Sequence, residues 1–133
     1  MKREDIIHRL DQFNCDPSEY WLVTGAAMVI YGMKDETSDI DMGCTAKMAD
    51  QLERDGHEAI RLDDGTRRFR IDHDIEIFEN WLFDRVELVE GIPVISIQGL
   101  IEMKRSLGRE KDKVDLERIE QYLQKNGRAM SEN

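Results

Sequence analysis

The feature that most constrains this chain is the segment Ser38–Met42, in which Asp39 and Asp41 alternate with Ile40 and Met42. A period of two predicts a β-strand with one apolar face and one acidic face. On such a strand the two carboxylates point the same way, about 6.5–7 Å apart along the chain. Like charges held side by side raise each other's pKa, and a divalent cation between them removes the repulsion. Carboxylate oxygens suit Mg²⁺ or Mn²⁺, so the segment predicts a metal site.

The residues before this strand predict how it is positioned. Trp21–Val23 reads as an apolar strand that ends at Thr24-Gly25, and Ala26–Tyr31 suits a short buried helix that Gly32 ends. Gly25 can adopt a backbone conformation that a Cβ would forbid, or let another group approach closely. An acidic pair on an ordinary exposed strand is the alternative interpretation, and this strand, glycine turn and helix favour the functional one.

A second acidic strand offers further ligands. Within Ile71–Phe78, Asp74 and Glu76 alternate with Ile75 and Ile77. If this strand lies beside the first, three or four carboxylates converge, which is costly without a cation. We expect Glu76 to be the third ligand, and Asp74, one pleat away, is the alternative. Both depend on an adjacency of strands that local patterning does not show.

Two groups of basic residues are candidates for binding anions. The first flanks a predicted hairpin turn at Asp64-Gly65 and comprises Arg61, Arg67, Arg68 and Arg70. It forms either an exposed hairpin face or a rim that meets phosphate or an anionic acceptor. The second lies near the C-terminus and comprises Lys104, Arg105, Arg109, Lys111 and Lys113. It is either a solvated helix face, or Lys104 or Arg109 binds the phosphates that the metals also bind.

Helical spacing and turn signals predict the remaining elements. We expect helices over residues 2–13, 45–55, 97–107 and 110–125, and extended segments over 20–24, 58–63, 66–71 and 92–96. Thr45 and Ser96 are expected to cap the helices that follow them. Trp81–Phe83 is expected in the core, and Val114 on the packed side of the last helix. Residues 126–133 are expected to be a disordered tail.

Composition limits the class of protein. A chain of 133 residues predicts one domain, over residues 1–125. No apolar run approaches the roughly 20 residues of a membrane span, so no membrane partner is expected. Two cysteines without metal-type spacing predict reduced thiols in a cytoplasmic protein. A net charge of −10 argues against a broad nucleic-acid-binding face.

Together the motifs resemble the nucleotidyltransferases of the DNA polymerase β type, and among them the small bacterial AbiEii-type toxins. The segments that carry the resemblance are Val23–Ala26, Gly32–Asp41, Glu76, Leu100–Lys104, Gly108–Asp112 and Asp115-Leu116. The resemblance implies an α/β (α+β) fold in which a mixed sheet is flanked by helices and followed by C-terminal helices.

It also implies a reaction, in which a nucleoside monophosphate moves from a nucleoside triphosphate to an acceptor hydroxyl and pyrophosphate is released. Two Mg²⁺ (or Mn²⁺) ions would be held by Asp39, Asp41 and Glu76. Nucleotide contacts fall on Gly25, Ala26, Thr37, Ser38, Lys104 and Arg109. The acceptor stays open between a small molecule, a tRNA end and a protein side chain, and a homo-oligomer or a partner protein could complete its site.

The chain departs from the family pattern at two positions. Ala26 stands where the family carries glycine or serine, and Asp35 where these proteins often carry arginine. The departures favour an alternative interpretation, in which the fold is kept as a catalytically inactive binding module, for example a toxin–antitoxin or regulatory partner.

Overall fold

The computed structural model describes residues 1–127, and the expected tail lies outside the described residues from residue 128 onward. Along this part of the chain the elements follow in the order α1 (Arg3–Phe13), β1 (Tyr20–Val23), α2 (Thr24–Tyr31), β2 (Ile40–Cys44), α3 (Ala46–Arg54), β3 (Ile60–Arg61), β4 (Arg67–Ile71), β5 (Ile75–Glu79), β6 (Val86–Val89), β7 (Ile92–Ile95), α4 (Ile97–Leu107) and α5 (Glu110–Lys125). The expected α/β class is confirmed.

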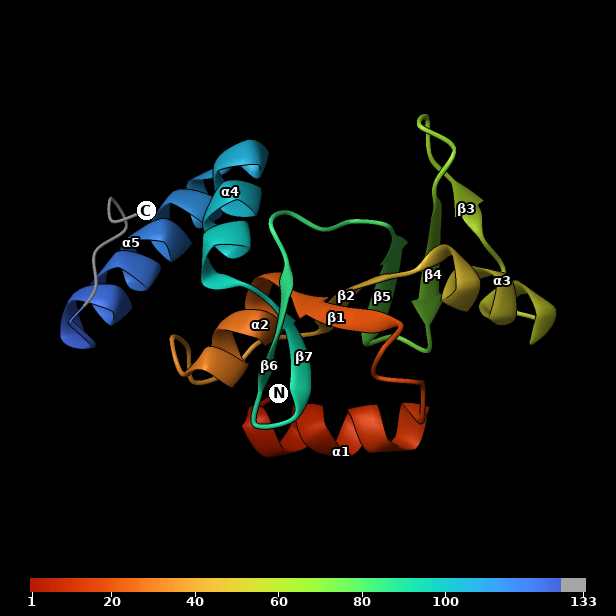
Figure 1. Ribbon diagram of the computed structural model, residues 1–133, viewed down its shortest axis with the longest axis horizontal. Coiled ribbons are helices and arrows are strands. Elements are labelled where there is room, and N and C mark those ends of the chain that lie inside the picture. Colours follow the sequence, from red (N-terminus) through yellow and green to blue (C-terminus); the bar gives the residue numbers. More distant parts are fainter. Residues whose placement is uncertain (128–133) are drawn as a thin grey trace.

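One mixed sheet organises the described chain, with the strand order β3-β4-β5-β2-β1-β7-β6 (Figure 1). The acidic strand β2 lies in its centre, antiparallel to β1 and parallel to β5. The two acidic strands are therefore neighbours, and their register places Asp41 opposite Glu76. Since directly paired residues project from the same face of a sheet, both carboxylates lie on one face.

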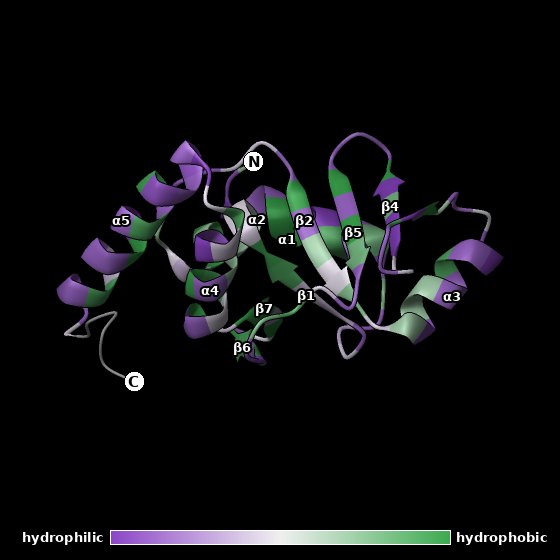
Figure 2. Ribbon diagram, turned by 90° about the horizontal axis from the view of Figure 1, so that it is seen from above, coloured by the Kyte–Doolittle hydropathy of each residue, from purple (hydrophilic) through white to green (hydrophobic). Residues whose placement is uncertain are grey.

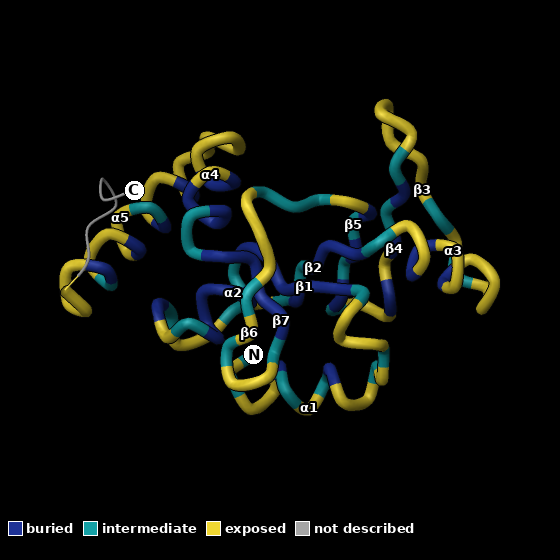
Figure 3. The backbone as a smooth tube through the Cα atoms, in the orientation of Figure 1, coloured by how far each residue is buried: buried dark blue, intermediate teal, exposed yellow. Residues whose placement is uncertain are grey.

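Strands β4 and β5 bury every second side chain. Phe69, Ile71, Ile75 and Ile77 are buried, whereas the residues between them are exposed or half-buried. Figure 3 shows this alternation along the strands beside the dark blue core around β1, β2 and α2. One face of this part of the sheet belongs to the core, and the other face is open to ligands.

Local signals place most helix ends correctly. The Thr45 hydroxyl accepts a hydrogen bond from the Met48 amide at 3.2 Å, and the Ser96 hydroxyl accepts one from the Gly99 amide at 3.0 Å. These bonds satisfy N–H groups that have no partner inside a helix. Gly32 ends α2 in the left-handed conformation, with φ of 87°.

Three expectations about local structure are wrong. The strand expected over residues 58–63 is reduced to Ile60–Arg61, because the following residues form the hairpin turn. Trp81–Phe83 packs against the core but is only half-buried. Val114 is 51% exposed, because the packed side of α5 carries Ile119 and Leu123 instead.

The helices lie on both sides of the sheet. Helix α1 runs along its lower side in Figure 1, and α4 and α5 pack together beyond the end of α2. Seen from above in Figure 2, α5 is purple on its outer side, as expected for a solvated helix face. Among the described helices, none is long and apolar enough to cross a membrane.

Candidate active site

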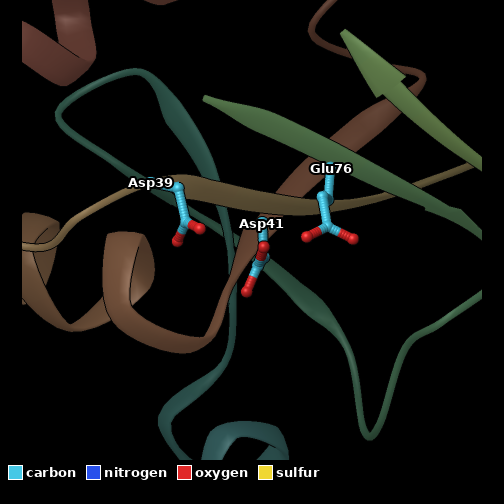
Figure 4. A group of neighbouring side chains, drawn as sticks. All are labelled: Asp39, Asp41 and Glu76. Atoms are coloured by element: carbon cyan, nitrogen blue, oxygen red, sulfur yellow. The ribbon is translucent and has the colours of Figure 1, made fainter. Parts of the chain in front are cut away.

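Three carboxylates converge at the centre of the sheet. Asp39 directly precedes β2, Asp41 lies in β2, and Glu76 lies opposite in β5. Each offers an oxygen, and these oxygens lie within 4.8 Å of one another (Figure 4). Ile40 and Met42, the residues that alternate with the two aspartates, are fully buried and anchor the strand. The predicted trio is therefore brought together by the pleat of β2 and by the register with β5.

Asp74 lies outside this cluster. Residues 72–74 form a turn, and β5 begins only at Ile75, so Asp74 does not follow the pleat of Glu76. Its carboxylate instead accepts hydrogen bonds from the Arg9 guanidinium at 2.8 and 3.1 Å. These bonds hold the pKa of Asp74 below its ordinary value. The alternative third ligand is thus a partner of α1, and Glu76 is the residue that joins the aspartates.

The environment of Asp41 disfavours its negative charge. Burial raises the pKa of this carboxyl, and the charges of Asp39 and Glu76 raise it further. A hydrogen bond from the Thr24 hydroxyl, at 2.8 Å, and the charge of Lys104 act in the opposite direction. The cluster therefore gains when positive charge is added beside it.

The donor set fits a hard divalent cation. The ligand atoms on offer are carboxylate oxygens from three side chains, all half-buried. Mg²⁺ binds through one or two carboxylates and keeps its other positions for water and phosphate oxygens. Asp39, Asp41 and Glu76 are therefore the residues that would hold such an ion.

The junction between β1 and α2 differs from the glycine turn that the sequence predicts. The residue in the left-handed conformation is Thr24, with φ of 50°, and not Gly25. Gly25 is needed for close approach, because a Cβ there would lie 2.4 Å from the Thr37 hydroxyl oxygen. Ala26 is fully buried, so its side chain packs in the core and only its backbone could reach a ligand.

A pocket of about 500 Å³ opens beside the two aspartates. Five of the six predicted nucleotide contacts line it, namely Gly25, Thr37, Ser38, Lys104 and Arg109. Sequence reasoning missed further lining residues, Thr24, Lys34 and Arg118. Lys111 also lines the pocket. It belongs to the second group of basic residues, but the resemblance assigns it no nucleotide contact. Lys34 and Arg118 had no signal of their own, because they come from different elements that only packing brings together.

Lys104 differs from a solvent-exposed phosphate ligand. It is buried, and its ammonium group lies 2.9 Å from Asp115 and 3.3 Å from Asp112. Burial alone would raise the pKa of Asp112, but hydrogen bonds from Arg109 and the charge of Lys104 lower it to about 2. Lys104 therefore joins α4 to α5, and its charge also acts on Asp41 from within the wall of the pocket.

The basic hairpin is neither a uniform rim nor a uniform exposed face. Arg67 is buried against the opposite side of the sheet, where it pairs with Glu79 at 2.8 Å. Arg68 and Arg70 alternate with the buried side chains, and Arg70 lies 3.7 Å from Glu76. Two of the four arginines are thus on the same face as the acidic cluster.

If the acidic cluster binds nucleotide through a divalent cation, removal of the Thr24 hydroxyl is expected to weaken that binding, because the hydroxyl holds the Asp41 carboxylate in position through a hydrogen bond of 2.8 Å. Thr24→Val has nearly the same shape and removes the hydroxyl, whereas Thr24→Ser keeps the hydroxyl. Titration of nucleotide against both variants, with and without Mg²⁺, checks this. Equal behaviour of the two variants would contradict a role for the hydroxyl in positioning Asp41.

Comparisons with known proteins agree on the fold. No family model and no curated protein matches the chain. Solved structures do match, among them TM1012 of Thermotoga maritima, a candidate nucleotidyltransferase, with a TM-score of 0.62, 18% identity and coverage of 94% of this chain and 96% of that one.

Two antibiotic-modifying enzymes also match. The lincosamide antibiotic adenylyltransferase LnuA, solved with lincomycin, has a TM-score of 0.54 and 16% identity over 86% of this chain and 92% of its own. ANT(2″)-Ia, solved with adenylyl-2″-tobramycin, has a TM-score of 0.56 and 14% identity over 93% and 88%. At these identities the likeness concerns the fold, and the narrower resemblance to AbiEii-type toxins stays a prediction. The chain has the nucleotidyltransferase fold.

Proposed function

We propose that this protein transfers a nucleoside monophosphate from a nucleoside triphosphate to an acceptor hydroxyl. The observation that carries the proposal is the convergence of Asp39, Asp41 and Glu76 next to a pocket with a cationic wall. Two proteins of the same fold are named for adenylyl transfer or contain an adenylylated product. The AbiEii-type resemblance and a cytoplasmic location, which suits two free cysteines, are part of the proposal.

The triphosphate would lie in the pocket beside the aspartates. The first N–H groups of α2 have no partner inside the helix, and a helix N-terminus favours phosphate. Lys34, Lys111 and Arg118 add positive charge from the other walls. These groups would hold the β- and γ-phosphates, so that the α-phosphate is directed toward Asp41.

In the reaction, the acceptor oxygen attacks the α-phosphorus and forms an O–P bond, while the bond from phosphorus to the bridging oxygen of pyrophosphate breaks. The proton of the acceptor hydroxyl would pass to the Glu76 carboxylate. Divalent cations held by the three carboxylates would neutralise the phosphate charge and polarise the reacting oxygens. The chain itself supplies positioning and electrostatics, which dominate catalysis of phosphoryl transfer.

The alternative is an inactive binding module. This alternative is based on the departures from the family pattern at Ala26 and Asp35, and the structure shows where each residue lies. The Ala26 side chain packs in the core, so a larger or polar group is not missing from the pocket. Asp35 is exposed and does not line the pocket with the aspartates. The active interpretation is therefore the one we propose.

Nucleotide binding is expected to raise the melting temperature in a metal-dependent way. We would measure thermal unfolding with ATP, GTP, CTP and UTP, each with and without Mg²⁺, for the wild type and Asp39→Ala. A nucleotide at 100 times its dissociation constant adds about 2.7 kcal/mol, which corresponds to several degrees for a chain of this size.

The pattern of shifts separates the alternatives. A shift for one nucleotide that needs Mg²⁺ and disappears in Asp39→Ala would support transfer and identify the base. Absence of a shift with all four nucleotides would overturn the proposal and favour the binding module. Asp35→Ala is the matched control, because it makes the same substitution at an exposed position outside the pocket.

A further inference from the structure

The acidic cluster has two different sides. On the side of Asp39 lies the cationic pocket between α2, α4 and α5. On the other side the sheet continues from Glu76 in β5 to β4 and β3. If the triphosphate occupies the pocket, an acceptor must approach the α-phosphate from the β5–β4–β3 side, because the attacking and leaving oxygens lie roughly in line.

This second side is a partly exposed face of the sheet, which we call the acceptor face and define by Arg68, Arg70, Glu76, Phe78 and Ile60. Register places these residues on one face, since Arg70 pairs with Glu76, Arg68 pairs with Phe78, and Ile60 pairs with Arg68. The side chains between them are those that face the core and α3.

Two arginines lie on this face beside Glu76, in a chain whose net charge is −10. Arg70 is more than half exposed, and its one described ion pair is the long contact of 3.7 Å with Glu76. The half-buried side chain of Arg68 makes no hydrogen bond or ion pair within residues 1–127. Cations bound at the acidic cluster would compete with Arg70 for Glu76 and leave both guanidinium groups available to an anion.

An aromatic pair lies next to the arginines. The rings of Phe78 and Trp81 have centroids 4.8 Å apart and are tilted by 60°. The Trp81 carbonyl accepts a hydrogen bond from the Trp21 indole at 2.9 Å, which holds the segment against Gly43 of β2. Half-buried aromatic side chains beside an exposed guanidinium group suit a flat ring that carries a negative charge.

We infer that the acceptor is a small molecule that carries a phosphate group and a flat ring as well as its hydroxyl; this rests on the proposed function. Arg68 and Arg70 bind the phosphate, the Phe78–Trp81 pair contacts the ring, and the hydroxyl is presented next to Glu76. A polycationic acceptor such as an aminoglycoside would be repelled by the two arginines. A long polyanion would meet the acidic surface of the chain beyond them.

Three matched compounds test the inference: 4-(hydroxymethyl)phenyl phosphate, benzyl alcohol and 4-(hydroxymethyl)benzylamine. They share the ring and the primary hydroxyl and differ in charge. Binding is followed by tryptophan fluorescence with Mg²⁺ and the nucleotide present. We expect the phosphate compound to bind at least tenfold more tightly than the alcohol, and the amine most weakly. With that nucleotide, the phosphate compound is also the expected substrate for transfer.

Charge reversal locates the binding. Arg68→Glu/Arg70→Glu is expected to weaken binding of the phosphate compound at least tenfold, whereas Arg54→Glu, at an exposed position of α3, leaves it unchanged. If Arg68→Glu/Arg70→Glu does not fold, the same binding measurement is made on the charge-neutralised variant Arg68→Gln/Arg70→Gln. The nucleotide-induced thermal shift is expected to persist in all variants. Absence of this shift in the wild type would show that the proposed function fails, whereas unchanged binding of the phosphate compound in the variants would show that only the acceptor inference fails.

Three results would overturn the inference. Tightest binding of the amine would show a cationic acceptor. Displacement of the phosphate compound by the nucleotide would place it in the donor pocket. Binding of a single-stranded RNA pentamer more than tenfold tighter than the phosphate compound, and lost in Arg68→Glu/Arg70→Glu, would show a nucleic-acid acceptor.

Discussion

Asp41→Asn is expected to lower the rate of nucleotidyl transfer about 10²–10³-fold while the fold persists. The substitution keeps the shape of the side chain and the possibility of a hydrogen bond with Thr24, but removes the central charge of the cluster. Loss of one preorganised group that stabilises the transition state typically costs 10²–10³-fold, and each tenfold corresponds to about 1.4 kcal/mol. Release of radiolabelled pyrophosphate in the presence of an acceptor measures the rate.

The same variant is expected to be more stable than the wild type when no divalent cation is present. Burial and the charges of Asp39 and Glu76 raise the pKa of Asp41, so the ionised form is disfavoured in the folded state. The asparagine removes this penalty at neutral pH, and its advantage disappears at pH values where the wild-type carboxyl is protonated in both states. Addition of Mg²⁺ is expected to stabilise the wild type and to have little effect on the variant.

Asp74→Asn is the control variant for the assignment of the carboxylates that bind the cation. It makes the same chemical change in the neighbouring acidic residue, which bonds to Arg9 outside the cluster. We expect this variant to keep its transfer rate and its stabilisation by Mg²⁺, with a small loss of stability. Full activity of Asp41→Asn, or an equal loss in both variants, would contradict the assignment of the site.

Arg67→Ala is expected to destabilise the protein by about 3–5 kcal/mol, the typical cost of removing one partner of a buried ion pair. The Arg67 guanidinium contacts both oxygens of Glu79, at 2.9 and 2.8 Å, and also reaches Asp50 and Glu53 of α3 at 2.9 and 2.7 Å. Arg67 and Glu79 are each less than a tenth exposed. Without the arginine, three carboxylates would face one another around a cavity, and urea unfolding at pH 7 measures the loss.

The pH dependence of the free energy of unfolding tests whether Glu79 is the ion-pair partner through which Arg67 stabilises the protein. Hydrogen bonds from Arg67 hold the pKa of Glu79 below its ordinary value. The resulting stabilisation is fully present above the pKa of an unfolded glutamate, about 4.3, and is lost as the pH falls through the lower pKa of the folded state. In Arg67→Ala this part of the acid dependence is expected to disappear. Arg68→Ala, one residue away on the exposed face, is expected to cost less than about 1 kcal/mol.

Local patterning predicted much of the site because the relevant physics is local. Alternation along β2 determines which side chains share a face, so Asp39 and Asp41 could be paired from their spacing alone. The caps of α3 and α4 involve donors and acceptors three residues apart, and they too were predicted. The glycine turn was predicted only in part, because the backbone strain falls on Thr24 and the steric requirement on Gly25.

Tertiary structure decided the residues whose partners are distant in sequence. The choice of Glu76 over Asp74 depends on a parallel register between β2 and β5 and on an arginine 65 residues before Asp74. Similarly, Arg67 and Arg68 look alike in the sequence, yet Arg67 is buried against α3, whereas Arg68 is half-buried on the acceptor face.

The sequence by itself thus determined most of the elements, most of their apolar faces and the acidic pair, because these follow from backbone geometry and from the period of side chains along one element. Only the tertiary structure decided the third carboxylate, the pocket beside the aspartates and the position of Arg68 and Arg70 on the acceptor face. A charged side chain enters the interior where partners from other elements compensate its desolvation, and a sequence does not show which elements those will be.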